Sequence, residues 1–170
     1  MVVSALVPCV ARAQAAPPLP LKMGLWQGTT VMKMSGLTLP PEIVERMRAA
    51  GRPVPGAEPK TMEMQSCLTP EKWKQIFTRA QNNENCKITN LKQDSSGMSA
   101  DVVCDSGRVG TGKGHLQMDF VSTEKVHGTM HMEIVSQQQQ PIVMDVTIDN
   151  TYQGADCKGV SPDTPKMIMK

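Results

Sequence analysis

Apolar and polar residues alternate through five successive segments in the second half of the sequence, with short polar turns between them. The segments are residues 86–92, 98–104, 115–121, 126–135 and 142–152. Two earlier segments alternate in the same way, residues 24–34 and 61–68. A two-residue period places the apolar side chains on one face of a strand, and short turns join antiparallel neighbours. The sequence therefore predicts a mainly β fold: a single curved antiparallel meander sheet of about seven strands, forming a half or open barrel.

Two short helices are predicted between these strands. The first lies in a Pro/Gly-rich insertion, residues 35–60, where PPEIVERMRAAG begins with prolines, ends with glycine and has apolar residues at helical steps, Ile43, Met47 and Ala50. The second spans about residues 70–81 and follows a hydroxyl cap at Thr69. Its apolar stripe consists of Trp73, Ile76, Phe77 and Ala80. We expect Trp73, Ile76 and Phe77 to pack against an end or the concave face of the sheet.

The N-terminus has the features of a cleaved export signal. Residues 1–15, MVVSALVPCVARAQA, are almost wholly apolar or small and end on the small-x-small pattern Ala13-Gln14-Ala15. Because basic residues are missing ahead of the apolar stretch, we expect the natural signal to be longer. A lipoprotein signal would use Cys9, but the proline before it fits poorly. No other apolar run reaches the ~20 residues of a membrane-spanning helix.

Beyond the signal, the sequence divides into a leader, one domain and a tail. Residues 16–23 are rich in proline and predict an extended leader. Residues 24–157 suffice for a single β-rich domain with one core, and residues 158–170 are expected to form a flexible tail. Lysine and arginine number 18 against 16 aspartate and glutamate, and both signs are scattered. Since this pattern favours neither nucleic acid nor an anionic membrane as partner, we expect a soluble monomer.

One short motif invites a nucleotide-binding interpretation. Residues 107–114 read GRVGTGKG, and Gly107, Gly112 and Lys113 have the spacing of a phosphate-binding loop. Such a loop needs Ser or Thr after the lysine and a helix after the loop. Here a glycine follows, and the next residues alternate as in a strand, with apolar Leu116, Met118 and Phe120. We therefore interpret the glycines as a bend or bulge that lets the sheet curve or another backbone approach.

Four cysteines remain after the predicted signal, Cys67, Cys86, Cys104 and Cys157. An even number in an oxidising compartment predicts two disulfides, and three connectivities are possible in principle. If residues 94–97 close a hairpin in which 92 faces 98, Cys86 faces Cys104 in a geometry suited to a cross-strand bridge. Cys67 then pairs with Cys157. The alternative, Cys67–Cys86 with Cys104–Cys157, stays open because a one-residue slip changes the facing pairs.

Methionine is frequent in this chain, with 14 residues, and it recurs as Met-x-Met in Met32/Met34, Met62/Met64, Met130/Met132 and Met167/Met169. Thioethers select Cu(I), so a periplasmic copper-handling protein that uses Met130, Met132 and His131 is the alternative function. In a strand, however, His131 points away from the face that carries Met130 and Met132. The simpler interpretation is that methionines fill irregular apolar gaps, with no metal or other cofactor.

No catalytic residue is predicted. The sequence contains no paired-carboxylate spacing, no G-x-S-x-G motif and no zinc-type cluster of histidine and cysteine. His127 and His131 share one strand face but lie roughly 13 Å apart, too far for one ion. We interpret these two residues and His115 as solvated surface groups.

Several short motifs follow one another in order: Gly24-Leu25-Trp26, Cys67-Leu68-Thr69-Pro70 before a helix, Cys86 and Cys104 flanking a hairpin, and Gly154-Ala155-Asp156-Cys157. In their order and spacing, over about residues 22–157, they resemble a family of exported bacterial proteins catalogued as domain-of-unknown-function family 3617. The resemblance implies a periplasmic, mainly β domain with bridged cysteines, and it implies no known activity. The Pro/Gly-rich insertion and the methionine content depart from that family.

These features lead us to expect an exported periplasmic protein that is not an enzyme. It would be a binding domain or an envelope-associated domain, because a curved sheet with an apolar inner face offers a place for a hydrophobic small molecule or an envelope component. No individual ligand-binding residue follows from the sequence.

Overall fold

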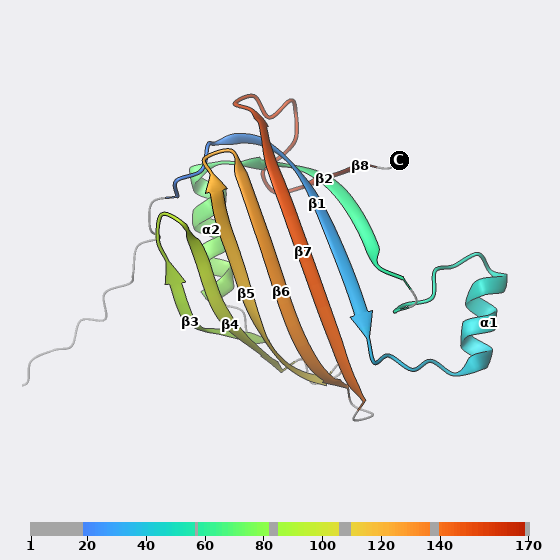
Figure 1. Cartoon of the computed structure of the whole chain (residues 1–170). Helices are drawn as coiled ribbons and strands as arrows, with labels where there is room; N and C mark the ends of the chain where they lie inside the picture. Colours follow the sequence, from blue (N-terminus) through green and yellow to red (C-terminus); the bar gives the residue numbers. More distant parts are fainter. Residues whose placement is uncertain (1–18, 57, 82–84, 106–109, 137–139, 169–170) are drawn as a thin grey trace, which may run out of the picture.

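The computed structural model describes residues 19–56, 58–81, 85–105, 110–136 and 140–168. The predicted signal peptide, with Cys9, and the first residues of the leader lie outside these ranges. The described chain forms one open antiparallel sheet of eight strands, not closed into a barrel, together with two helices (Figure 1). The mainly β class and the antiparallel arrangement predicted from the alternation are confirmed.

The strands follow the alternating segments closely. They are β1 (Gly24–Ser35), β2 (Lys60–Leu68), β3 (Cys86–Gln93), β4 (Gly97–Asp105), β5 (Gly110–Ser122), β6 (Lys125–Ser136), β7 (Pro141–Gly154) and β8 (Lys166–Ile168). Their order across the sheet is β3-β4-β5-β6-β7-β1-β2-β8. Strands β3 to β7 thus form a meander, and its last strand returns to pair with β1.

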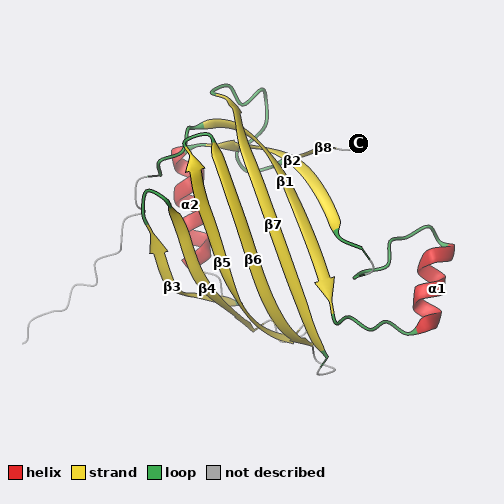
Figure 2. Ribbon diagram, in the orientation of Figure 1, coloured by secondary structure: helices red, strands yellow, loops and turns green. Residues whose placement is uncertain are grey.

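The two helices have different settings. The first turn of α2 (Pro70–Gln81) is capped as predicted, since the hydroxyl of Thr69 accepts a hydrogen bond of 3.1 Å from the backbone N–H of Lys72. This helix connects β2 with β3 and lies across one face of the curved sheet (Figure 1). In contrast, α1 (Pro41–Ala49) lies to the side of the sheet and buries none of its residues (Figure 2). Its apolar stripe therefore contributes little to the core.

The two-residue period of the strands gives the sheet two chemically different faces. We call the face that α2 covers the inner face, and it carries apolar side chains such as Trp26, Leu116 and Ile148. We call the opposite face the outer face, and it carries exposed polar and charged side chains, including those of His115 and Asp145. The main apolar surface therefore lies between α2 and the sheet.

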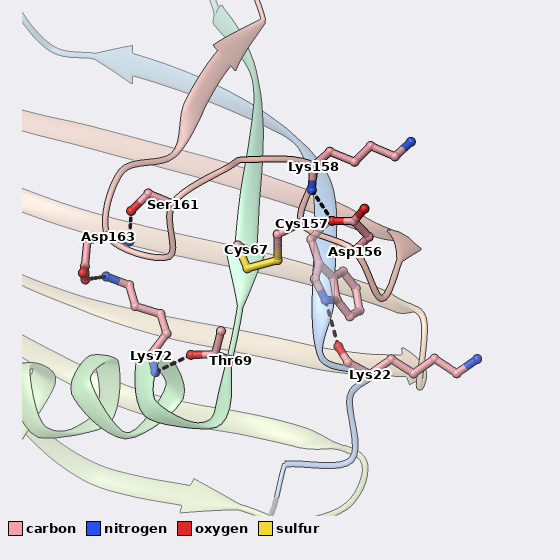
Figure 3. The surroundings of a disulfide bond; sticks show 10 residues. Lys22, Cys67, Thr69, Lys72, Asp156, Cys157, Lys158, Ser161 and Asp163 are labelled. Atoms are coloured by element: carbon pink, nitrogen blue, oxygen red, sulfur yellow. Dashed lines mark hydrogen bonds and ion pairs between the residues drawn. A yellow bond between two sulfur atoms is a disulfide. The ribbon is translucent and has the colours of Figure 1, made fainter.

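The chain after β7 is tied to the outer face. A disulfide joins Cys157 to Cys67 over a sequence separation of 90 residues (Figure 3). Buried Val160 packs with Leu25 and Cys67 in a small cluster, and β8 pairs with β2. The expectation of a flexible tail over residues 158–170 is therefore corrected for residues 158–168. The disulfide and Val160 hold this segment against the sheet, where its end adds a strand.

The second disulfide joins Cys86 in β3 to Cys104 in β4, whose Cα atoms lie 4.0 Å apart in directly opposite positions. Both cysteine pairs are those that follow from the hairpin register. The alternative connectivity, in which Cys67 bonds Cys86, is absent from the described chain.

The register near the turn of this hairpin differs from the prediction. Lys92 pairs with Ser99, so the predicted facing of residues 92 and 98 is wrong. A bulge between residues 89 and 92, with Asn90 at a φ of 51°, takes up one residue. Beyond the bulge the strands return to the predicted register, and the two cysteines face each other.

Candidate ligand cavity

A cavity of about 390 Å³ lies between α2 and the inner face of the sheet. Its walls come from both helix and strands: Trp73 and Ile76 project from α2, while Leu116 and Phe120 project from β5. Trp26 from β1, only 4% exposed, forms another wall. Trp73 and Ile76 thus face the sheet across the cavity, and Ile76 is 46% exposed, while the side chains of Phe77 and Ala80 lie outside the described part of the structure.

The cavity is almost entirely apolar. Its polar lining residues in the described chain are Ser66 and Asn150, and no Asp, Glu, Lys, Arg or His side chain lines it there. The indole N–H of Trp26 already donates a hydrogen bond of 3.0 Å to the carbonyl oxygen of Lys22. A guest would therefore meet mainly carbon and sulfur surfaces, with the hydroxyl of Ser66, the amide of Asn150 and the indole of Trp73 as the further groups that carry hydrogen-bonding atoms.

The leader forms part of the cavity wall. Leu19 and Leu21 line the cavity, and the backbone N–H of Lys22 donates a hydrogen bond of 2.9 Å to the carbonyl oxygen of Thr123, between β5 and β6. The ammonium of Lys22 pairs with Glu124. The hydrogen bond that the carboxylate of Glu124 accepts from this ammonium, together with the negative charge of Glu124, raises the pKa of Lys22. These contacts hold the leader against the turn that joins β5 and β6.

Glycines on the inner face make room for methionines. A β-carbon on Gly128 would collide with the thioether of Met118, and one on Gly114 would collide with the thioether of Met132. The methionines of β1 to β7 all share this face by strand register. Their interpretation as apolar filler accords with these positions, because flexible thioethers fit irregular spaces.

The phosphate-loop spacing has a structural explanation. Gly112 and Gly114 lie inside β5, and no helix follows them. The side chain of Lys113 points to the outer face and pairs with Glu133 at 3.2 Å. Gly107 lies outside the described residues. Gly112 and Gly114 pair in continuous register with β4 and β6, so the expected bulge is absent at these two positions. The expected close approach of a neighbouring backbone is present at Gly114, where a β-carbon would collide with the carbonyl oxygen of His131.

The residues of the copper interpretation are separated by the sheet. Met132 is buried on the inner face, and Met130 shares that face. His131 points to the outer face, where Nδ1 lies 2.7 Å from Oδ1 of Asp145. His115 and His127 are also on the outer face. No histidine therefore joins the methionines within the described residues.

Some lining residues could have been found from sequence and others could not. Period-two alternation marks Leu116, Met118 and Phe120 as members of one face. Asn150 shares its strand face with Ile148 but is polar, so the apolar alternation does not mark it. Leu19 reaches the same cavity because the leader crosses the β5–β6 turn. Neither residue is marked by a sequence pattern.

Comparisons with known proteins assign the chain to a family but do not indicate a function. A family model described as "Protein of unknown function (DUF3617)" matches residues 21–157. No curated protein matches the chain. Among solved structures, the S-type phycobiliprotein lyase CPES from Guillardia theta matches with 6% sequence identity and a TM-score of 0.30, covering 78% of this chain and 88% of that chain. At this TM-score, the match says nothing about function.

Proposed function

The chain belongs to the DUF3617 family of proteins of unknown function, and on that premise we propose that it is a binding protein for a neutral, apolar small molecule. The observation that carries this proposal is the apolar cavity between α2 and the inner face. Ligand pockets of about 300–1,000 Å³ with mostly apolar walls and a few polar groups are typical of small-molecule sites. Because the family has no known activity, the proposal is based on the chemistry of the cavity.

The chemistry of the walls selects the class of ligand. Burial of an alkyl chain is favourable by roughly 0.8 kcal/mol per methylene group. A carboxylate or phosphate inside the cavity would lose its hydration and find no cation among the described lining residues. Ser66 and Asn150 can bond one hydroxyl or carbonyl oxygen. The ligand is therefore a long-chain alcohol, ester or similar neutral lipid.

The same cavity argues for binding without catalysis. Catalysis of acyl transfer or hydrolysis needs a nucleophile, a general base or an activated water close to the reacting atom. Among the described lining residues, Ser66 is the one nucleophile type, and no histidine or carboxylate lines the cavity beside it. Retention of an unaltered ligand is the role that these residues support.

The proposed location is the periplasm after removal of residues 1–15. Two disulfides are typical of an oxidising compartment, and neither helix in the described ranges is long and apolar enough to cross a membrane. Cell fractionation followed by N-terminal sequencing tests the location. A periplasmic form that begins at Ala16 supports it, whereas a cytoplasmic protein that retains residues 1–15 opposes it.

Displacement of a fluorescent acyl probe by unlabelled lipids tests the ligand class. Ile88→Trp adds volume to the cavity from the edge strand β3, and Val103→Trp adds the same group to the exposed outer face. We expect Ile88→Trp to weaken probe binding and Val103→Trp to leave it unchanged. If both folded variants bound the probe equally well, the probe would bind outside the cavity.

A further inference from the structure

Four side chains of the outer face form a row across four neighbouring strands. Asp101 in β4 pairs with His115 in β5. His115 pairs in turn with His131 in β6, which pairs with Asp145 in β7. Directly opposite residues of antiparallel strands have β-carbons about 4.5–5.5 Å apart. Two imidazoles therefore lie side by side at the centre of the row, with a carboxylate beyond each.

Each carboxylate fixes the ring nitrogen that faces it. Nδ1 of His115 lies 2.7 Å from Oδ1 of Asp101, and Nδ1 of His131 lies 2.7 Å from Oδ1 of Asp145. Because a carboxylate only accepts hydrogen bonds, each Nδ1 carries the proton and donates it. In the neutral ring the lone pair is then on Nε2, as in histidines whose second nitrogen binds a metal ion.

The carboxylate of Asp101 is itself held in place. Nδ2 of Asn90 donates a hydrogen bond of 2.7 Å to its Oδ2. An ionised carboxylate in a fixed position orients the imidazole and makes its Nε2 a better ligand.

We propose that His115 and His131 bind one divalent transition-metal ion between their Nε2 atoms, with water completing its coordination. Imidazole nitrogen suits Zn²⁺, Ni²⁺ and Cu²⁺. Both side chains are accessible, at 55% and 54% exposure. The carboxylate of Glu133 comes within 4.0 Å of Nε2 of His131 but pairs with Lys113 at 3.2 Å. No three His, Cys, Asp or Glu side chains of the described chain form a metal site, so the protein supplies two ligands. The site therefore binds more weakly than a four-ligand structural zinc site.

His127 provides a matched control on the same face. Its Nδ1 lies 2.8 Å from Oδ1 of Asp149, and its side chain is 40% exposed. The residue opposite it in β5 is Asp119 and not a second histidine. His127 thus has the orienting carboxylate and the accessibility, but it lacks the neighbouring imidazole on which the proposed site depends.

Calorimetric titration of the untagged full-length protein with Zn²⁺ tests the site. We expect the unsubstituted protein to bind one ion, His115→Ala and His131→Ala each to lose saturable binding, and His127→Ala to keep it. Absence of binding by the unsubstituted protein at millimolar Zn²⁺ would overturn the proposal. So would an equal loss in His127→Ala.

Substitution of the carboxylates tests the orienting role without removing a ligand. Asp101→Asn is expected to weaken Zn²⁺ binding by about 10–100-fold, as outer-shell substitutions do at other metal sites. Asp149→Asn, the counterpart beside His127, is expected to leave the affinity unchanged. Nuclear magnetic resonance of the ring nitrogens should show Zn²⁺ shifting Nε2 of His115 and His131. Equal shifts at His127 would contradict the paired site. The site lies on the face opposite the cavity, so its failure leaves the lipid proposal standing.

Discussion

The thioether of Met118 in β5 lies over Gly128 in β6, in the space that a β-carbon on residue 128 would occupy. Met118 also lines the apolar cavity. The missing side chain at position 128 therefore lets a flexible methionine lie flat against the sheet. The cavity depends on a glycine that does not itself line it.

Replacement of Gly128 with alanine should force Met118 away from the sheet. Overpacking of this kind typically costs about 1–3 kcal/mol of unfolding free energy, and urea denaturation measures it. In the double variant Gly128→Ala/Met118→Ala the new methyl group no longer collides with a thioether. The two substitutions should then cost less together than the sum of their separate costs. Full additivity would show that the collision is not the cause.

The two disulfides should differ in their contributions to stability. Cys67–Cys157 closes a loop with a sequence separation of 90, and Cys86–Cys104 closes one of 18. In the chain-entropy model, loops of these sizes contribute about 4–5 and about 3 kcal/mol. Denaturation of Cys67→Ser/Cys157→Ser and Cys86→Ser/Cys104→Ser compares them. A greater loss of unfolding free energy in Cys86→Ser/Cys104→Ser would mean that interactions of the disulfides in the folded protein, and not the entropy of loop closure in the unfolded chain, determine their contributions.

The β3–β4 turn should contribute a pH-dependent term to stability. Oδ1 of Asp94 accepts hydrogen bonds from the hydroxyl and the backbone N–H of Ser96 and from the N–H of Gly97. These bonds, that from the Ser96 hydroxyl first, lower the pKa of Asp94 from its ordinary value of 3.8.

Because the folded-state pKa is depressed, this stabilisation is complete above the ordinary value and disappears as the pH falls through the folded value. Asp94→Asn should therefore be less stable than the unsubstituted protein at neutral pH and equally stable in strong acid. Urea denaturation over a pH series measures both. A difference that stays constant across the series would rule out the ionised carboxylate as its source.

The bulge in β3 should tolerate glycine better than a β-branched residue. Asn90 has a φ of 51°, a left-handed conformation in which a β-carbon costs about 1–2 kcal/mol. Asn90→Gly and Asn90→Val both lose the hydrogen bond to Asp101. The valine variant should nevertheless be less stable than the glycine variant in thermal unfolding. Equal stability would indicate that the bulge moves elsewhere at no cost.

The sequence predicts those parts of the fold that depend on local periodicity. Alternation identifies the seven long strands, and Thr69 marks the start of α2, because each signal lies within a few residues. The Cys86–Cys104 pair follows from a hairpin register, but the bulge at Asn90 is invisible in the sequence. Two departures, a shifted turn and a bulge, cancel and leave the cysteines opposite each other.

Features that depend on distant pairing could not be predicted in the same way. The strand β8 is three residues long and forms where the Cys67–Cys157 disulfide brings the chain back to β2. The neighbouring imidazoles of His115 and His131 depend on the register between β5 and β6. The cavity depends on α2 and the leader meeting the inner face. None of these contacts has a period or a motif in the sequence.

Quenching of tryptophan fluorescence by a brominated fatty acyl ester tests the proposed ligand cavity most directly. The chain has two tryptophans, and both Trp26 and Trp73 line the cavity. Bromine quenches an indole at short range, so a bound brominated chain should reduce the emission in a saturable manner, while the same ester without bromine should not. Ile88→Trp would add a third emitter, so Ile88→Phe serves as the cavity-filling variant and should weaken the effect. Emission that is the same with and without bromine, up to the solubility limit of the ester, would contradict an acyl ligand between α2 and the sheet.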